Sequence, residues 1–189
     1  ILYPPVDLNR LEVNSDDGFA SPFCDEPYYV YLGALVPYKR ADLAIQACRT
    51  LGKNLLVIGN GSELKKLKEF SEKKIKFITN ANDKFVKQSL SKAKALLFPG
   101  EEDFGIVVLE AMACHTPVIA YRRGGAIDTI TEETGLFFSE QTKESLSDAI
   151  TKFENIPENF WKKENFLEHV DKFSKENLKK CLTKRKKAY

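Results

Sequence analysis

Short apolar runs alternate with longer amphipathic stretches along most of the chain, from residue 28 onward. The short runs predict strands, and the stretches whose apolar residues repeat with helical period predict helices. The predicted strands are Tyr28–Leu32, Asn54–Ile58, Lys76–Thr79, Ala95–Phe98, Pro117–Ala120 and Gly135–Phe138. The predicted helices are Arg40–Leu51, Ser62–Glu72, Asp83–Lys92, Ile106–Ala113, Ala126–Thr131, Lys143–Phe153, Pro157–Phe166 and Lys175–Lys184.

The order of these elements predicts the fold class. Strands that alternate with helices make right-handed crossovers, which build a parallel sheet with helices on both faces. The near-continuous apolar runs at Leu55–Ile58, Leu96–Phe98 and Val118–Ala120 fit strands that are buried on both sides. Residues 28–189 are therefore expected to form an α/β domain with a doubly wound parallel Rossmann-like sheet. Residues 1–27, which are rich in prolines and polar turn-formers, are expected to be a linker that leads into it.

Composition narrows the class of protein only a little. The 189 residues are 43% hydrophobic and 30% charged, as in an ordinary globular domain, and a net charge of +2 gives no global reason for a nucleic-acid partner. The four cysteines form no Cys/His cluster, so no metal site is expected and reduced thiols in the cytoplasm are the simplest account. No signal peptide and no apolar run of membrane-spanning length is found. Because the first residue is Ile, the N-terminus is expected to be a cut.

Basic residues crowd the end of the chain, at Lys179, Lys180, Lys184, Arg185, Lys186 and Lys187. The simpler interpretation is a solvated helix face that ends in a tail. The alternative is a weak electrostatic contact with the anionic cytoplasmic face of a membrane.

Glycines follow the predicted strands at the edge of the sheet where ligands of such folds bind. Gly33 follows the first strand, Gly59 and Gly61 follow the second, and Gly105 stands between the fourth strand and a helix. Glycine lets backbone N–H groups approach a ligand, and a helix N-terminus attracts phosphate. Each loop alone is weak support, because tight strand–helix turns need glycine anyway. Several such loops at one edge favour a ligand that carries phosphate.

Charged residues at the same edge supply candidate chemistry. Lys39 and Arg40 stand at a helix start, where the helix dipole disfavours cations, so a task other than helix stability is indicated. Cations in this place would stabilise a diphosphate leaving group. Glu102 and Glu110 lie on either side of a helix start, and carboxylates accept hydrogen bonds from vicinal hydroxyls of a sugar or ribose. On spacing alone, exposed surface glutamates are the commoner interpretation.

The stretch from Glu102-Asp103-Phe104-Gly105-Ile106 through Glu110 to Thr116-Pro117-Val118 resembles the E-x7-E segment of glycosyltransferase family 4. Gly124-Gly125, Gly135-Leu136-Phe137-Phe138 and Pro37-Tyr38-Lys39-Arg40 match in order and spacing, and the resemblance runs from about Tyr3 to Leu182. The E-x7-E segment with its flanks is highly specific. The resemblance implies the GT-B fold, two Rossmann-like domains that face each other across a cleft. This chain resembles the C-terminal domain, which binds a nucleoside diphosphate sugar, and the N-terminal acceptor domain would be a missing partner.

The resemblance also implies roles for individual residues. Glu102 would hold hydroxyls of the donor sugar, Glu110 would hold the ribose hydroxyls, and Lys39 would contact the diphosphate. Lys39 and Glu102 are thus the candidate catalytic residues, and Glu102 is not interpreted as a nucleophile. The other candidate donor-binding residues are Gly33, Arg40, Gly59, Gly61, Asp103, Phe104, Gly105 and Ile106. No cofactor or metal is expected, because cationic side chains and a helix dipole would neutralise the leaving diphosphate.

Two positions depart from the family pattern. Ala34 stands where an arginine that assists the lysine is common. The loss of that contact would cost about 2–4 kcal/mol of transition-state stabilisation, unless Arg40 or Arg122 substitutes. His115 stands where a glycine is usual, and it is interpreted as a helix-end histidine that faces the negative end of the dipole.

The leading hypothesis is a retaining, metal-independent transfer of a hexose to an unidentified acceptor. The segments around Lys39 and Glu102 look most like those of mannosyltransferases, which makes GDP-mannose the first choice of donor. The alternative is a nucleotide-binding module without turnover of its own, because catalysis needs the second face of the cleft. An unrelated dehydrogenase is disfavoured, because no G-x-G-x-x-G segment follows the first strand.

Overall fold

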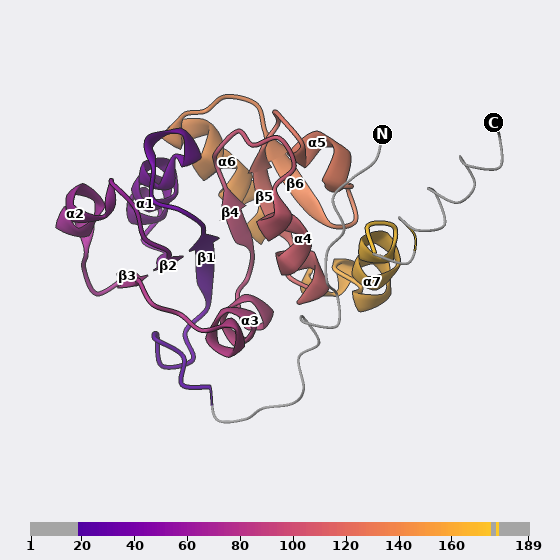
Figure 1. The fold of residues 1–189 in the computed structure, drawn as a ribbon, viewed down its shortest axis with the longest axis horizontal. Coiled ribbons are helices and arrows are strands. Elements are labelled where there is room, and N and C mark those ends of the chain that lie inside the picture. The colour runs from indigo at the N-terminus through magenta and orange to yellow at the C-terminus, as the bar shows by residue number, and fades with distance from the viewer. Residues whose placement is uncertain (1–18, 175–176, 178–189) are drawn as a thin grey trace.

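Six strands, all parallel, form one sheet in the order β3-β2-β1-β4-β5-β6, seen in a computed structural model that describes residues 19–174 and 177. The strands are β1 (Tyr28–Leu32), β2 (Asn54–Ile58), β3 (Ile75–Ile78), β4 (Leu96–Phe98), β5 (Val118–Tyr121) and β6 (Gly135–Phe138). The order turns back between β1 and β4, which lie side by side at the centre of the sheet (Figure 1). The doubly wound α/β fold is therefore confirmed. The switch point between β1 and β4 is where such folds bind ligands.

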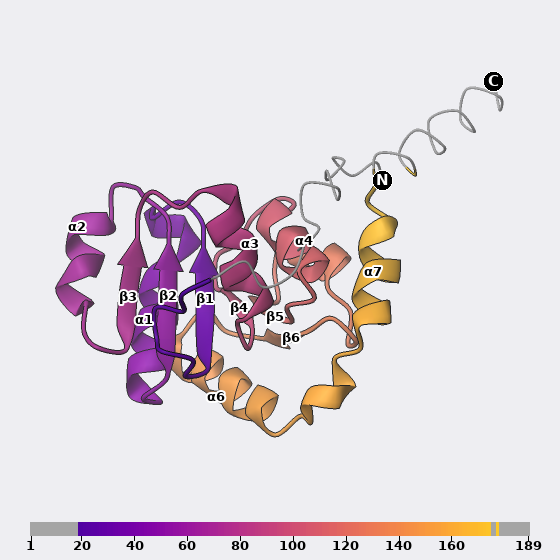
Figure 2. The same cartoon turned by 90° about the horizontal axis from the view of Figure 1, so that it is seen from below.

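Seven α-helices of the described chain surround this sheet: α1 (Ala41–Thr50), α2 (Leu64–Leu67), α3 (Asp83–Ser91), α4 (Ile106–Ala113), α5 (Ala126–Thr129), α6 (Lys143–Glu154) and α7 (Lys163–Asp171). Short 3-10 turns occupy Pro37–Lys39, Lys68–Phe70 and Glu158–Phe160. Figures 1 and 2 show α2 and α7 at opposite ends of the molecule, beyond the β3 and β6 sides of the sheet.

The alternation of side chains along each strand produces two separate cores. In β1, Tyr28 and Val30 belong to a cluster with α3, α4, α5 and α7, whereas Tyr29 and Tyr31 belong to a cluster with α1, α2 and α6. Both sides of β1 are thus buried, as the near-continuous apolar runs predicted. Helix α1 packs against α6 on one face, and α4 packs against α7 on the other.

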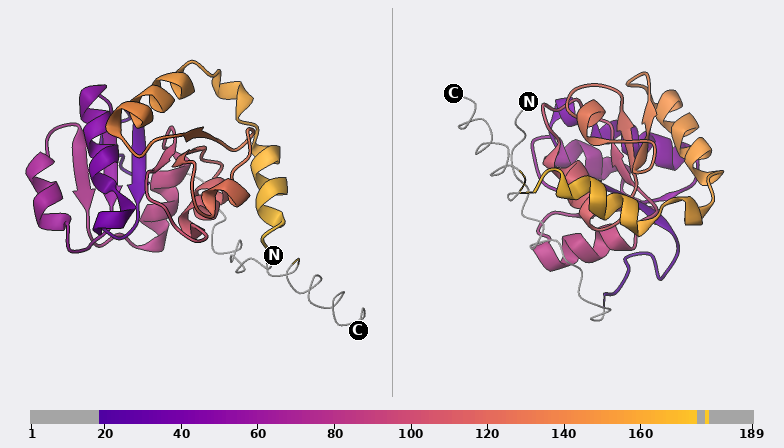
Figure 3. Two further views of the ribbon diagram at one scale, coloured as in Figure 1. Left: turned by 90° about the horizontal axis from the view of Figure 1, so that it is seen from above. Right: turned by 90° about the vertical axis from the view of Figure 1, so that its right-hand side faces the viewer.

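The prediction of a helix at Pro157–Phe166 is wrong in its bounds. A 3-10 turn at Glu158–Phe160 is followed by non-helical Trp161 and Lys162, and α7 begins only at Lys163. The Trp161 ring stacks on Phe153 at a centroid distance of 5.4 Å, and this packing interrupts the helical path. Figure 3 shows the chain passing from α6 on one face of the sheet round to α7 on the other.

The helix predicted from Ser62 to Glu72 is also shorter than expected. Helix α2 begins at Leu64, its last turn tightens into the 3-10 turn, and Ser71 is extended. The helix predicted at Lys175–Lys184 and the basic end of the chain lie outside the described residues. Of the predicted linker, residues 1–18 also lie outside them. The described remainder packs on the domain, where Phe23 is buried and Lys76 Nζ lies 5.0 Å from its ring centroid.

Candidate functional site

The turn after β1 places Lys39 above the end of that strand. Pro37 opens a 3-10 turn that ends at Lys39, and Arg40 takes a left-handed conformation, φ +53°, before α1 begins. Gly33 lies underneath, since a Cβ added there would stand 3.9 Å from Lys39 Nζ. Since 3.9 Å is an ordinary contact distance, the end of β1 lies directly beside the ammonium group of Lys39.

The loop after β4 places Glu102 opposite Lys39. The two side chains form an ion pair, with Nζ 2.9 Å from Oε1, and only 16% and 20% of their surfaces are exposed. The N–H of Gly125, in the loop after β5, donates to the carbonyl oxygen of Glu102 at 2.8 Å. The pair thus joins the two loops that meet at the switch point, and a third loop holds the backbone of Glu102.

Helix α4 begins beside this ion pair, at Gly105. Gly105 is the N-cap with φ +71°, a left-handed conformation that favours glycine, and no side chain caps the helix. The first turn contains no acidic residue. The first N–H groups of an α-helix have no acceptor within the helix and carry a positive partial charge. The start of α4 is therefore suited to an anion.

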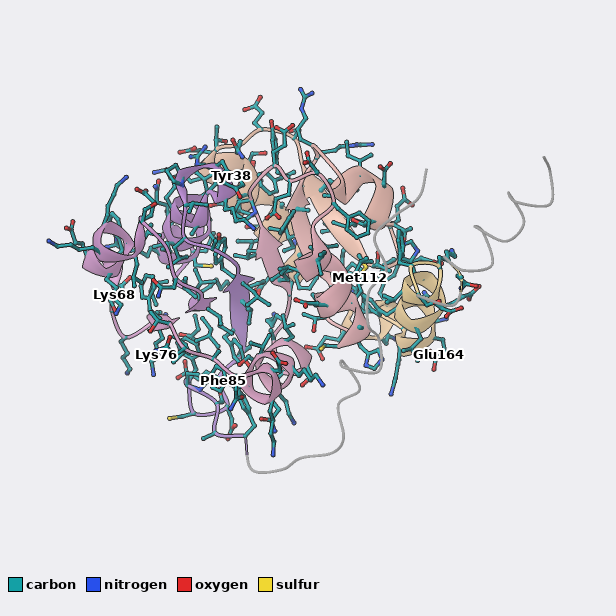
Figure 4. The ribbon with its side chains drawn as sticks, in the orientation of Figure 1. Tyr38, Lys68, Lys76, Phe85, Met112 and Glu164 are labelled. Atoms are coloured by element: carbon teal, nitrogen blue, oxygen red, sulfur yellow. The ribbon has the colours of Figure 1, made fainter. Side chains whose placement is uncertain are left out.

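The ion pair and the start of α4 border an open pocket of about 580 Å³. It is lined by Tyr38, Lys39, Glu101, Glu102, Asp103, Phe104, Gly105, Ile106 and Val107. Six of these residues were predicted donor-site residues, and the sequence analysis did not single out Tyr38, Glu101 and Val107 as site residues. Figure 4 labels Tyr38, whose side chain is 60% exposed, at the edge of the molecule where the central strands end. Its place directly before Lys39 was the signal that could have identified it.

Arg40 and Arg122 are not among the residues that line this pocket. The Arg40 guanidinium makes two hydrogen bonds to the carboxylate of Asp42, at 3.0 and 3.1 Å, and a third of 3.3 Å to Gln141. The Arg122 guanidinium lies over the Phe137 ring, 5.7 Å from its centroid. Neither arginine stands in the structure as a second cation beside Lys39 to compensate for Ala34. Binding of the donor by Arg40 stays a prediction.

Gly59 and Gly61 have a structural task that the sequence analysis did not foresee. A Cβ at Gly59 would stand 1.9 Å from the carbonyl oxygen of Gly33, and one at Gly61 would stand 2.4 Å from that of Leu35. The loop after β2 therefore lies directly against the loop after β1, and Leu35 N–H donates to the carbonyl oxygen of Asn60 at 2.8 Å. Both glycines lie outside the pocket lining. Their contact with a nucleoside stays a prediction.

Glu110 is half-buried and stands one turn after Ile106 on α4. It does not line the pocket either, so its contact with a ribose stays a prediction.

At the other end of α4, His115 follows the C-cap Cys114, as expected for a helix-end histidine. Its φ of +59° explains why a glycine suits this position. Burial, and then Lys163, lower the pKa of His115, which favours the neutral ring.

Tyr31 lies beneath the ion pair and donates a hydrogen bond of 3.2 Å from its hydroxyl to the carbonyl oxygen of Ala34. Burial, followed by the nearby carboxylates of Glu102 and Asp42, raises the pKa of this phenol. Tyr31 is therefore a neutral donor that supports the turn carrying Lys39.

Within the described part of the chain, no group of three or more His, Cys, Asp or Glu side chains could hold a metal ion.

The fold is thus a doubly wound α/β domain whose switch point carries the Lys39–Glu102 ion pair and the uncapped start of α4. A family model described as glycosyl transferases group 1 matches residues 16–179. The chain therefore belongs to the group 1 glycosyltransferases, and the resemblance inferred from its sequence is confirmed.

Two relatives illustrate the family. An uncharacterized glycosyltransferase of Methanocaldococcus jannaschii is 30% identical over 172 residues, which are 87% of this chain and 48% of the relative. A GDP-mannose-dependent monoacylated alpha-(1-6)-phosphatidylinositol monomannoside mannosyltransferase of Corynebacterium glutamicum is 31% identical over 139 residues, which are 65% of this chain and 36% of the relative. The chain thus spans at most about half the length of these relatives.

Solved structures share the fold at lower identity. Sucrose-phosphate synthase from Thermosynechococcus elongatus has a TM-score of 0.82 at 24% identity, with 99% of this chain and 51% of that chain covered. HepE of Anabaena, in complex with UDP and glucose, has a TM-score of 0.81 at 16% identity, with 100% of this chain and 56% of that chain covered.

Over residues 19–174 and 177, none of the helices combines the length and apolar character that crossing a membrane requires. The cytoplasmic location stays a prediction.

Proposed function

We propose that this chain is the nucleotide-sugar-binding half of a retaining, metal-independent glycosyltransferase that transfers a hexose, with mannose as the first candidate. The observation that carries the proposal is the pairing of Lys39 and Glu102 next to the uncapped start of α4. A cation and a helix N-terminus suit a diphosphate, and a carboxylate next to them suits the hydroxyls of an attached sugar.

The proposed chemistry divides the work between these groups. The bond between the anomeric carbon of the sugar and the diphosphate oxygen breaks, and negative charge grows on the leaving diphosphate. Lys39 and the first N–H groups of α4 stabilise that charge, in place of a metal ion. Glu102 holds the sugar hydroxyls and forms no bond to carbon. An acceptor hydroxyl attacks from the face that the diphosphate leaves, assisted by a phosphate oxygen, which retains the anomeric configuration.

Two kinds of relative bear on the donor. The printed name of the Corynebacterium relative specifies GDP-mannose, and other relatives are named alpha-1,3/1,6-mannosyltransferases. The Anabaena structural neighbour holds UDP. The first group supports GDP-mannose as the donor to test first, with UDP-sugars as the competing choice.

Isothermal titration of GDP, UDP and ADP against the folded chain tests the donor site. We expect one diphosphate, GDP first, to bind more tightly than the others, and Lys39→Ala to weaken that binding at least tenfold, since a charged contact to phosphate contributes about 1.5–3 kcal/mol. Lys143→Ala, an exposed lysine at the start of α6, is the matched control and should bind like the wild type. If no diphosphate binds to the folded protein, the proposal is wrong.

A nucleotide-binding module without turnover is the second candidate. It is favoured by the placement of every pocket-lining residue within one domain, on two turns and the start of α4, in a chain that spans only 48% of its Methanocaldococcus relative. Such a module would bind the donor as proposed and leave catalysis to a second domain.

A further inference from the structure

The ion pair between Lys39 and Glu102 occupies the place where the ligand is proposed to bind. The two groups are 2.9 Å apart, and about four-fifths of each side chain is hidden from solvent. Both line the pocket. Among the described residues no second carboxylate pairs with Lys39, so each charge of the pair is neutralised by the other.

The backbones that carry these two side chains are held firmly. The Glu102 carbonyl accepts the 2.8 Å bond from Gly125, and a Cβ at Gly124 would stand 2.3 Å from the same oxygen. A Cβ at Gly100 would stand 2.8 Å from the Cα of Lys39, so the two loops lie in contact. The loops therefore hold the two backbones at a fixed separation, and a rotation of the side chains is enough to part the ion pair.

The other charges of the pocket repel an anionic ligand, so the binding of such a ligand depends on the Lys39–Glu102 pair. The lining contains one lysine and the three carboxylates of Glu101, Glu102 and Asp103, which gives it a formal charge of −2. A diphosphate that takes over Lys39 removes the counter-charge of Glu102 and places phosphate oxygens next to its carboxylate. Like charges at short range in a partly buried site repel each other strongly.

An attached sugar resolves this conflict, because its hydroxyls donate hydrogen bonds to the carboxylate in place of the ammonium group. We propose that the Lys39–Glu102 ion pair makes the site select the sugar-bearing nucleotide over the bare nucleoside diphosphate. The inference rests on the proposed function and adds an order of affinity to it, in which the sugar nucleotide binds more tightly than the bare diphosphate. Once the sugar has been transferred, the diphosphate faces an unpaired carboxylate, and re-formation of the ion pair favours its release.

The experiment compares the dissociation constants of GDP and GDP-mannose for the wild type, Glu102→Gln and Glu101→Gln, by isothermal titration. If GDP does not bind, the diphosphate that does bind and its sugar conjugate replace them. Glutamine keeps the size of the side chain but removes the charge, so Glu102→Gln is expected to bind GDP about fivefold to tenfold more tightly than the wild type. The same variant is expected to bind GDP-mannose no more tightly than the wild type.

Glu101→Gln is the matched control, because it removes the same charge from the pocket lining without breaking the ion pair. It is expected to tighten GDP binding by less than about twofold. Unchanged or weaker GDP binding by folded Glu102→Gln would overturn the inference, and so would an equal gain in Glu101→Gln. In either case the donor site itself would stand. A folded wild type that binds no diphosphate would instead remove the proposed function.

Discussion

Glu102 and Glu110 belong to one short segment, yet their surroundings differ. Glu102 lines the pocket and pairs with Lys39, whereas Glu110 is half-buried one turn into α4 and does not line the pocket. Ile106, four residues before Glu110, does line it and is 50% exposed. The two carboxylates thus have different surroundings, and their assignment to the sugar and to the ribose stays a prediction.

Replacement of Glu110 tests this division. Glu110→Ala is expected to weaken the binding of a plain nucleoside diphosphate about tenfold, because a hydrogen bond to a charged group contributes about 1.5–3 kcal/mol. Isothermal titration measures the change. Glu132→Ala, an exposed glutamate in the turn before β6, serves as the control and should bind like the wild type. Equal binding by Glu110→Ala and the wild type would contradict the assignment of Glu110 to the nucleotide.

The residue types of the site could be predicted, but their pairings could not. Lys39 and Glu102 were predicted as site residues because both follow strands that end at one sheet edge and match motifs of the family, and the structure joins them in an ion pair. Arg40 has the same sequence context as Lys39. Its side chain is nevertheless bound by Asp42, and Arg40 takes a left-handed backbone conformation that no spacing pattern reveals.

At the scale of the elements, the end of α6 makes a polar contact with the sheet through one carboxylate, in addition to the apolar packing of the helix. Glu154 accepts hydrogen bonds from Tyr29 at 2.7 Å, Lys94 at 2.9 Å and Lys53. Tyr29 lies in β1, and the two lysines stand just before β2 and β4. Burial raises the pKa of Glu154, but the hydrogen bonds from Lys53, Tyr29 and Lys94 outweigh burial and lower it to about 2. The ionised carboxylate therefore stabilises the fold at the edge opposite the pocket.

Glu154→Gln is expected to lower the free energy of unfolding by about 2 kcal/mol at pH 7. Because the folded pKa lies below the ordinary value, the contribution is complete above about pH 4.5 and is lost as the pH falls toward 2. The difference from the wild type should therefore shrink to less than about half at pH 3. Urea denaturation at both pH values measures it, with Glu132→Gln as the control. A difference that does not depend on pH would contradict the role of the charge.

Strands were predicted within one residue at each end, whereas the helices predicted at Ser62–Glu72 and Pro157–Phe166 were not. Apolar runs such as Leu55–Ile58 are bounded by polar residues, so their ends are visible in the sequence. The break before α7 depends on Trp161 stacking on Phe153, a contact between residues of separate elements. A periodic pattern continues across such a break, and only the tertiary packing ends the helix.

At the scale of the whole molecule, every pocket-lining residue comes from one side of a domain that is about half as long as its Methanocaldococcus relative. A reaction between two substrates requires both to be held in place. The chain alone is therefore expected to bind the donor without transferring the sugar.

Assay of the folded chain with GDP-mannose and a panel of acceptor lipids and glycans tests this expectation. Release of GDP should stay at the background rate, although titration shows binding of the nucleotide. Chain heated until it unfolds provides the background. Robust release of GDP that depends on the acceptor would contradict the need for a second domain, and would make this chain an enzyme by itself.

The contact of Gly59 with Gly33 and of Gly61 with Leu35 has a consequence for protein engineering. The loops after β1 and β2 fit closely against each other, so a loop transplanted alone from a relative would meet a neighbour of the wrong shape. Chimaeras that aim at a new donor should exchange both loops together as one cassette. Libraries that randomise either loop should keep these two glycines fixed.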